Sequence, residues 1–403
     1  MRDSRHLLLV NVFFAPFSYG GATVVAEQVA QALVRQGGTR ITAVSLISRT
    51  DLAPYTVIRT EQSGIPNYLI NVPAGRGYAE IYDNPEVTAV VARLMDQLTP
   101  DLMHVHCIQD IGAGIFQAAR DRALPTILSV HDFWWICDRQ FMIRVDQSYC
   151  AQSPVRIENC RSCVEDFDAA KARFDRLGHL GTLADLVTYP SRFARDLSEA
   201  SGFAPGKGVV WENGVRLPGA GFFEAQAARR KNDPRLSFGF VGGPSQIKGW
   251  PVIRRAFASL TREDFRGLAV EGSLDGSWWA GHDLSDLPGD WQIHPRFSQN
   301  EMDDFYAQID VLLFMSQWKE TFGLAIREAL ARGIRVIQTD SGGTTEHGTV
   351  PAEDLIPIGA GPDVLRRQLE ATLATHPAPM APHDVASFDD QARAFTGLMD
   401  QIN

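Results

Sequence analysis

The chain has 403 residues, of which 45% are hydrophobic and 21% are charged, and its formal net charge at pH 7 is −10. This length predicts two domains, each large enough to bury its own core. The composition is that of an ordinary soluble α/β protein. The negative charge argues against nucleic-acid binding and gives no general attraction to an anionic membrane.

The beginning of the chain leads straight into a short apolar strand and lacks the long apolar stretch and cleavage site of a signal peptide. No apolar run reaches the ~20 residues needed to span a bilayer. We therefore expect a cytoplasmic protein. The one tight basic cluster, Arg229-Arg230-Lys231, leaves open a peripheral contact with the inner face of a membrane. A solvated linker is the favoured interpretation of this cluster.

Apolar runs alternate with amphipathic stretches along the chain, which is the pattern of parallel sheets built from βαβ units. The expected strands of the first half are residues 7–12, 41–46, 102–106, 126–130 and 186–189. Near 205–235 the pattern breaks into Pro, Gly and charged residues, which indicates an interdomain linker. A second Rossmann-like unit begins at 236–241, and a Pro-rich passage at 377–382 precedes a final helix over 388–402.

Two glutamates, Glu320 and Glu328, bracket a segment that passes Phe322-Gly323 and then becomes rich in helix formers. Gly323 allows a sharp turn into the helix, whose first free amides can bind a phosphate. One carboxylate before the turn and one two turns into the helix can accept hydrogen bonds from hydroxyls on either side of that phosphate. On composition alone most such Glu pairs are solvated, but this arrangement predicts a nucleotide-sugar site.

The segments around this pair support the prediction. An apolar strand at 311–315 leads to Glu320, and a second one at 336–337 runs into the Gly-rich segment 340–346. Ligands of parallel sheets bind at the carboxyl ends of the strands. Both carboxylates are therefore expected at such an edge.

In this order the segments resemble a family 4 retaining glycosyltransferase of GT-B fold, whose E-x7-E motif matches Glu320 and Glu328. The resemblance extends over nearly the whole chain, and the order of the pieces is more specific than any one of them. The other matching segments are residues 16–21, 37–38, 100–106, 129–132, 190–193, 213–215, 240–242 and 248–249.

The resemblance implies an α/β fold with two Rossmann-like parallel-sheet domains that face a central cleft. The N-terminal, acceptor-side domain is expected over residues 1–213, with a Cys-rich insertion at about 137–163. The nucleotide-sugar-binding domain is expected over 214–383, and a helix over 384–403 should cross back to the first domain.

By the same resemblance the protein is a hexosyltransferase-type enzyme of polysaccharide or glycoconjugate biosynthesis. It would transfer a sugar from an α-linked UDP- or GDP-sugar to a saccharide or lipid-linked saccharide, with retention and without a catalytic metal or cofactor. A front-face mechanism is favoured, in which the leaving phosphate takes the proton of the acceptor.

The resemblance also implies the roles of individual residues. Lys248 would neutralise the leaving diphosphate, while His131 and Glu320 would contact the transferred sugar, and these three are the expected catalytic residues. The expected donor-binding residues are Gly20, Gly21, Gly242, Lys248, Glu320, Phe322, Gly323, Leu324 and Glu328.

The chain departs from the family at the second positive side chain, besides Lys248, that would neutralise the diphosphate. Many members carry an Arg directly after the Gly of the second domain's first strand, but this chain has Gly243. Arg139, Arg192 and Arg296 are unranked substitutes.

Four cysteines, Cys137, Cys150, Cys160 and Cys163, fall within the insertion. Four thiolates that include a Cys-x-x-Cys can bind a structural zinc ion and stabilise a loop that lacks a core. Free buried thiols and a disulfide are the alternatives, the latter disfavoured in a reducing compartment. The neighbouring pair His104 and His106 suggests a metal at first sight, but packing and lining of the site are favoured.

Several further alternatives remain open. The tryptophans Trp134, Trp135, Trp278 and Trp279 could stack on sugars or fill a core, and base selection is expected near residues 294–296. A GT-B sugar-nucleotide epimerase or hydrolase and a catalytically silent scaffold compete with the transferase. A dinucleotide-dependent oxidoreductase is disfavoured, because the first strand lacks Gly-x-Gly-x-x-Gly.

Overall fold

The computed structural model describes residues 4–273, 275–348 and 350–402, and the chain divides into two compact units. Unit 1 contains the chain up to Phe141, Ala151–Gly214 and the chain from Ala386 onward. Unit 2 contains Met142–Cys150 and Val215–Val385. The main division lies one residue beyond the expected boundary at 213. Part of the expected Cys-rich insertion groups with unit 2 rather than with unit 1.

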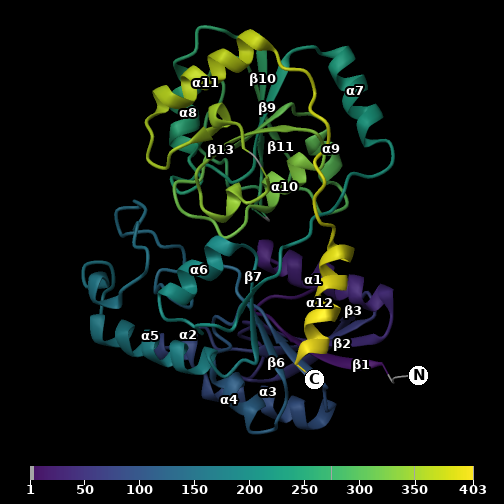
Figure 1. Cartoon of the computed structure of the whole chain (residues 1–403), viewed down its shortest axis with the longest axis vertical. Coiled ribbons are helices and arrows are strands. Elements are labelled where there is room, and N and C mark those ends of the chain that lie inside the picture. The colour runs from purple at the N-terminus through teal and green to yellow at the C-terminus, as the bar shows by residue number, and fades with distance from the viewer. Residues whose placement is uncertain (1–3, 274, 349, 403) are drawn as a thin grey trace. The chain divides into compact units, whose positions relative to one another are not determined.

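Unit 1 is built on an eight-stranded sheet with the order β3-β4-β2-β1-β5-β6-β7-β8 (Figure 1). All neighbouring strands are parallel except β3 and β4. The apolar runs of the sequence form the central strands because both faces of a parallel sheet are covered. The strands are β1 (Arg5–Val10), β2 (Thr39–Ile47), β3 (Val57–Gln62), β4 (Ile65–Asn71), β5 (Leu102–Val105), β6 (Thr126–Ser129), β7 (Leu186–Tyr189) and β8 (Gly208–Val210).

The last helix, α12 (Phe388–Gln401), belongs to unit 1. It begins with a capping box of Ser387 and Asp390, and Phe395 on its buried face stacks on His104 at 4.2 Å between ring centroids. The indole of Trp211 donates a hydrogen bond to the carbonyl of Gln391 (3.0 Å). The other helices are α1 (Gly21–Gln36), α2 (Tyr78–Tyr82), α3 (Pro85–Leu98), α4 (Gly114–Arg120), the 3₁₀ turn Ile157–Cys160, α5 (Phe167–Gly181) and α6 (Arg192–Ala200).

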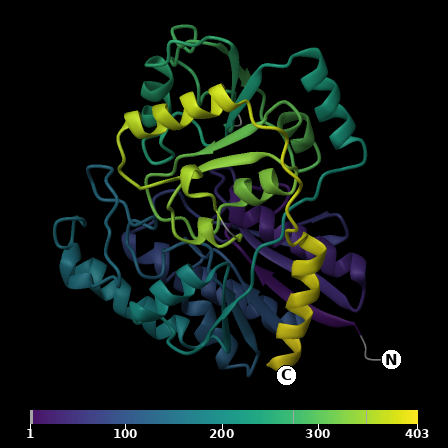
Figure 2. The ribbon, with the colours of Figure 1, turned by 45° about the horizontal axis from the view of Figure 1, so that its top comes forward.

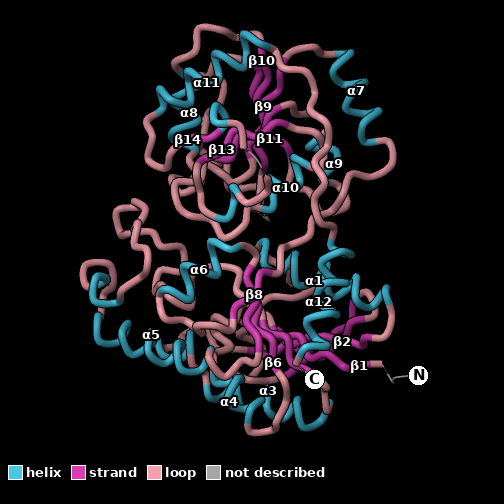
Figure 3. Tube along the Cα trace, viewed as in Figure 1, coloured by secondary structure: helices cyan, strands magenta, loops and turns pink. Residues whose placement is uncertain are grey.

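Unit 2 contains a six-stranded parallel sheet with the order β11-β10-β9-β12-β13-β14, enclosed by helices (Figure 3). Its strands are β9 (Leu236–Phe240), β10 (Phe265–Val270), β11 (Asp290–His294), β12 (Val311–Phe314), β13 (Arg335–Thr339) and β14 (Leu355–Ile356). Its helices are α7 (Phe222–Asn232), α8 (Trp250–Ala258), α9 (Met302–Tyr306), α10 (Leu324–Leu330), the 3₁₀ turns Gly343–Thr345 and Ala352–Asp354, and α11 (Pro362–Thr375).

Helices cover both faces of this sheet, and Figure 2 shows α11, in yellow, across one of them. Because side chains alternate along a strand, Val311 and Leu313 pack with residues of α8 and α11 on one face. Leu312 and Phe314 pack with residues of α9 and α10 on the other. Among the described residues, no helix is both long and apolar enough to cross a bilayer.

The expected linker at 205–235 is wrong in part, because it contains β8 and α7. The basic cluster lies on α7 and is not a solvated linker. Arg229 is only 8% exposed and makes two hydrogen bonds to Asp310, of 2.7 and 3.0 Å. Arg230 binds the same carboxylate at 2.7 Å. Asp310 directly precedes β12, so these ion pairs hold α7 against the sheet.

This buried ion pair generates a stability prediction. Asp310→Ala leaves two guanidinium groups without their shared carboxylate and is expected to lower the free energy of unfolding by about 3–5 kcal/mol. Urea denaturation measures the change. Asp264→Ala is the matched control, because it removes an exposed Arg262–Asp264 pair and should leave the midpoint nearly unchanged. Equal midpoints for the two variants would contradict the assignment.

Candidate functional site

Two loops at the carboxyl edge of the unit 2 sheet bring Lys248 and Glu320 together. These loops follow β9 and β12, which are neighbours in the sheet. Lys248 Nζ lies 2.7 Å from Glu320 Oε1, and the hydroxyl of Ser316 donates to the same oxygen at 2.6 Å. The ammonium also lies 5.2 Å from the centroid of the Trp318 ring. The sequence analysis did not single out Ser316, although it lies only four residues before Glu320.

The close approach of the two loops depends on Gly249. This residue has φ +81°, and a Cβ atom on it would lie 2.0 Å from the carbonyl oxygen of Met315. Any larger residue would therefore push the β9 loop away from the end of β12. The amide of Gln317 donates to the carbonyl of Ile247 at 2.8 Å. At Gly242 a Cβ would meet the Lys248 side chain at 3.1 Å, so Gly242 borders this lysine.

The backbone of Glu320 is tied to the loop after β13. Its amide donates to the carbonyl of Ser341 (2.9 Å), and its carbonyl accepts from the amide of Gly343 (3.0 Å). Glu320 also forms an isolated parallel bridge with Gly342. These contacts tie the loop after β12 to the loop after β13 and hold the carboxylate beside Lys248.

The turn into α10 follows the sequence prediction, with Gly323 at φ +85° immediately before the helix. Phe322 is buried at 3% exposure, so its side chain packs inside the unit, while Leu324 is half-buried. Glu328 is buried, and its Oε2 accepts a hydrogen bond from the Tyr306 hydroxyl at 2.8 Å. Burial raises the pKa of Glu328, while Tyr306 and Arg332 act in the opposite direction.

The ring of Trp278 packs against Gly243, the position at which many family members carry an arginine. Gly243 has φ +66°, and a Cβ atom there would lie 2.6 Å from the ring of Trp278. Trp278 is 37% exposed, whereas Trp134, Trp135 and Trp279 are 5% exposed or less and fill the core. The unranked substitutes Arg139 and Arg192 belong to unit 1, and Arg296 is an exposed residue of unit 2.

The predicted site residues of unit 1 lie at the ends of β1 and β6. Gly20 and Gly21 are exposed at the start of α1. His131 is half-buried after β6, and its Nε2 lies 2.8 Å from Nδ1 of His106. Burial lowers the pKa of His131 to about 4, so its imidazole is neutral at pH 7. His104 and His106 are buried, in agreement with the packing role that the sequence favoured over a metal site. His104 hydrogen-bonds Ser129 at 2.8 Å.

The lowered pKa of His131 generates a pH prediction. In the unfolded chain this imidazole binds a proton below its ordinary pKa near 6.5, whereas in the folded chain it stays neutral down to about 4. Stability should therefore fall as the pH falls between these values, by about 2 kcal/mol from pH 7 to pH 5 for this group.

Urea unfolding of the wild type and of His131→Gln at both pH values measures this contribution. The variant should lose less stability on acidification, because it lacks the His131 imidazole, which the folded chain keeps neutral down to about pH 4. An identical loss in both would show that His131 is protonated in the folded state.

The expected structural zinc site is not assembled. Within residues 4–273, 275–348 and 350–402, no group of three or more His, Cys, Asp or Glu side chains could hold a metal ion. All five cysteines are half-buried thiols. Cys150 belongs to unit 2, whereas Cys137, Cys160 and Cys163 belong to unit 1, so the four thiols do not form a ligand set within one unit.

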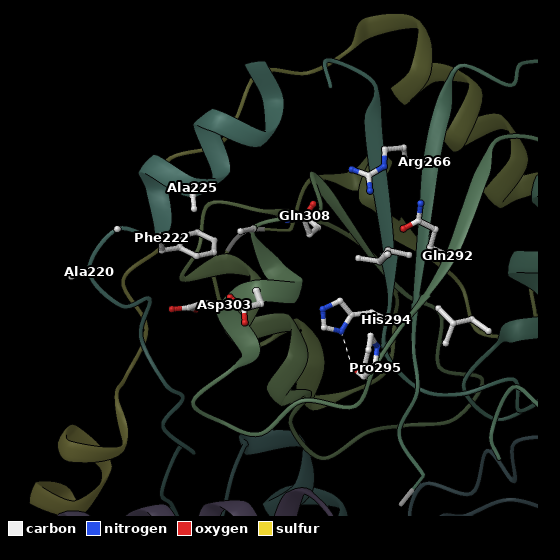
Figure 4. A pocket seen from close by; sticks show the side chains of 14 residues that line it. Ala220, Phe222, Ala225, Arg266, Gln292, His294, Pro295, Asp303 and Gln308 are labelled. Atoms are coloured by element: carbon white, nitrogen blue, oxygen red, sulfur yellow. Dashed lines mark hydrogen bonds between the residues drawn. The ribbon is translucent and has the colours of Figure 1, made fainter. Parts of the chain in front are cut away.

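An open cavity of about 660 Å³ lies in unit 2 between α7, α9, β10 and β11 (Figure 4). Its described lining includes Arg266, Gln292, His294, Pro295 and Asp303. His294 and Pro295 fall in the segment where base selection was expected. Lys248 and Glu320 lie outside this set, so the cavity is not the site built around them.

Comparisons with known proteins bear on the family of the chain and on its fold. Residues 19–217 match the sequence profile of Glycosyltransferase Family 4, and residues 235–374 match that of Glycosyl transferases group 1. The chain belongs to glycosyltransferase family 4. A relative from Klebsiella pneumoniae, described as an uncharacterized 42.6 kDa protein in the cps region, is 22% identical and covers 85% of this chain and 87% of its own.

Solved glycosyltransferase structures share the fold. Sucrose-phosphate synthase from Thermosynechococcus elongatus superposes with a TM-score of 0.71 at 15% identity, covering 98% of both chains. Anabaena Alr3699/HepE in complex with UDP and glucose gives a TM-score of 0.66 at 16% identity, over 98% of this chain and 99% of that one. The expected α/β fold of GT-B type is confirmed for this glycosyltransferase.

Proposed function

We propose that this glycosyltransferase moves a hexose from an α-linked nucleotide-sugar donor to a saccharide or lipid-linked saccharide, with retention and without a catalytic metal. The pairing of Lys248 with Glu320 at 2.7 Å is the observation that carries the proposal. It puts a cation, for the leaving diphosphate, beside a carboxylate that can accept hydrogen bonds from sugar hydroxyls.

When a donor binds, Lys248 and Glu320 would each exchange the other for a group of the ligand. A diphosphate oxygen would take Lys248 from Glu320, and the carboxylate oxygen thus released would accept from a hydroxyl of the sugar. Ser316 remains on the same oxygen and keeps the carboxylate oriented during the exchange. The negative charge of the diphosphate would therefore release the Glu320 carboxylate, which then binds the sugar.

The donor and the acceptor are proposed from the relatives. Alr3699/HepE binds UDP and glucose, which favours a UDP-sugar over a GDP-sugar for this chain. The cps-region relative favours an acceptor of surface-polysaccharide assembly on the cytoplasmic side of the membrane. The buried Glu328, held by Tyr306, is proposed to meet the ribose with its remaining hydrogen-bonding capacity.

Ligand binding tests the two roles separately. In EDTA, wild-type protein should bind UDP and GDP with different affinities, and the matching nucleotide-sugar should bind more tightly than its free nucleotide. Lys248→Met should weaken binding of the free nucleotide about 10- to 100-fold, since a hydrogen bond to a charged group is worth about 1.5–3 kcal/mol. Glu320→Gln should remove only the advantage of the sugar. Isothermal titration measures each affinity.

Lys231→Met is the matched control, because Lys231 is an exposed lysine of α7 and should bind as the wild type does. Wild-type affinity in Lys248→Met would refute the assigned clamp. Binding with no turnover of any donor, with or without saccharide, would favour the silent scaffold. Donor hydrolysis that no acceptor accelerates would favour the hydrolase.

A further inference from the structure

Arg327 is a fully buried cation within the Glu320–Glu328 motif, directly before Glu328. The residue is 2% exposed on α10, and its guanidinium lies 4.0 Å from the centroid of the Phe322 ring. In the sequence Arg327 stands between Ile326 and Glu328, and the structure buries both of these neighbours.

The guanidinium donates hydrogen bonds to three backbone carbonyls. Nη1 donates to Phe322 and to Thr344 at 3.0 Å, and Nη2 donates to Gly343 at 2.9 Å. Phe322 belongs to the turn that follows Glu320, whereas Gly343 and Thr344 form the 3₁₀ turn after β13. One side chain thus joins two turns that are separate in the sequence.

These two turns are the ones that hold Glu320. The carbonyl of Glu320 accepts from the amide of Gly343, and its amide donates to Ser341. The carbonyl of Gly343 in turn accepts from Arg327. The guanidinium therefore closes a ring of hydrogen bonds around the backbone that carries the carboxylate.

The chemistry of the side chain suits this role. Burying a guanidinium is costly unless its donors are satisfied, and an apolar residue of similar volume would fill the space at lower cost. A lysine would keep the charge but would lack the planar fork that reaches carbonyls of two turns at once. The particular contribution of arginine here is the geometry of its fork.

We propose that Arg327 is a positioning residue of the donor site, which locks the Glu320 turn to the Gly343–Thr345 turn and thereby sets where the Glu320 carboxylate meets the transferred sugar. The inference rests on the proposed function of Glu320. Arg327 contacts no reacting group and acts through the backbone of Glu320.

The hydrogen-bond network that Arg327 forms with the two turns can be tested without any ligand. Hydrogen–deuterium exchange of Arg327→Lys and Arg327→Met should show amides of Glu320 and Gly343 that exchange about tenfold faster or more. Protection in the strands of unit 2 should be unchanged. Arg229→Met is the matched control, since it removes another buried arginine of unit 2, one that binds Asp310. Unchanged protection at both amides in Arg327→Lys would overturn the proposal.

A double-mutant cycle tests the link to the sugar. With the donor found by titration, Arg327→Lys should lower kcat about 10- to 100-fold while free-nucleotide affinity stays near that of the wild type. In the Glu320→Gln background the same substitution should change kcat by less than about twofold, because the group it positions is already altered. Multiplicative losses would overturn the proposal.

The two claims fail in distinguishable ways. The Glu320 and Gly343 amides could lose protection in Arg327→Lys while the wild type turns over no nucleotide-sugar. That result would support the hydrogen-bond network around Arg327 and contradict the proposed function. If the wild type transfers sugar but protection and the cycle show no coupling, the proposed function stands and the role of Arg327 falls.

Discussion

The contact between Lys248 and Glu320 requires the loops after β9 and β12 to approach so closely that their backbones touch. Several other contacts at this edge of the unit 2 sheet support that approach. Gly249 permits the approach, because a side chain at that position would collide with the end of β12. The isolated bridge between Glu320 and Gly342 then fixes the second loop. The remaining contacts of the edge, including those of Ser316, refine the position of one carboxylate.

Electrostatics explains why such a pair belongs in a transferase. Each charge is half-buried and compensates the other before a ligand arrives, so neither bears the full cost of an isolated charge. Under the proposed function, the diphosphate of the donor would change this balance by offering a stronger partner to the lysine. An aromatic ring at Gly243, where an arginine is common in the family, leaves Lys248 as the principal cation that the structure places beside Glu320 in unit 2.

Much of this arrangement could be predicted from the sequence. The apolar runs predicted β1, β2, β5, β6, β7, β9, β12 and β13 to within a few residues, because buried strands carry a dense apolar signal. The strong local signal of Phe322-Gly323 likewise predicted the turn into α10. Strand adjacency then accounts for the meeting of Lys248 and Glu320, which are far apart in the chain.

Other features depend on tertiary contacts that no local pattern encodes. Helix α7 was missed because glycine and proline precede it and its buried arginines resemble a solvated basic run, whereas Asp310 binds both. The contact of Trp278 with Gly243 joins the loops of two strands and could not be read from either one. The cysteine spacing suggested zinc, but the fold does not bring the thiols together within one unit.

Retention at the anomeric carbon is the central claim, and one measurement tests it most directly. With an α-linked donor of gluco configuration, the new glycosidic bond should show by NMR the small anomeric coupling constant of an α-linked sugar. We expect this α-linked product, because the proposed front-face displacement keeps the configuration of the donor sugar. A β-linked product from the same donor would contradict it.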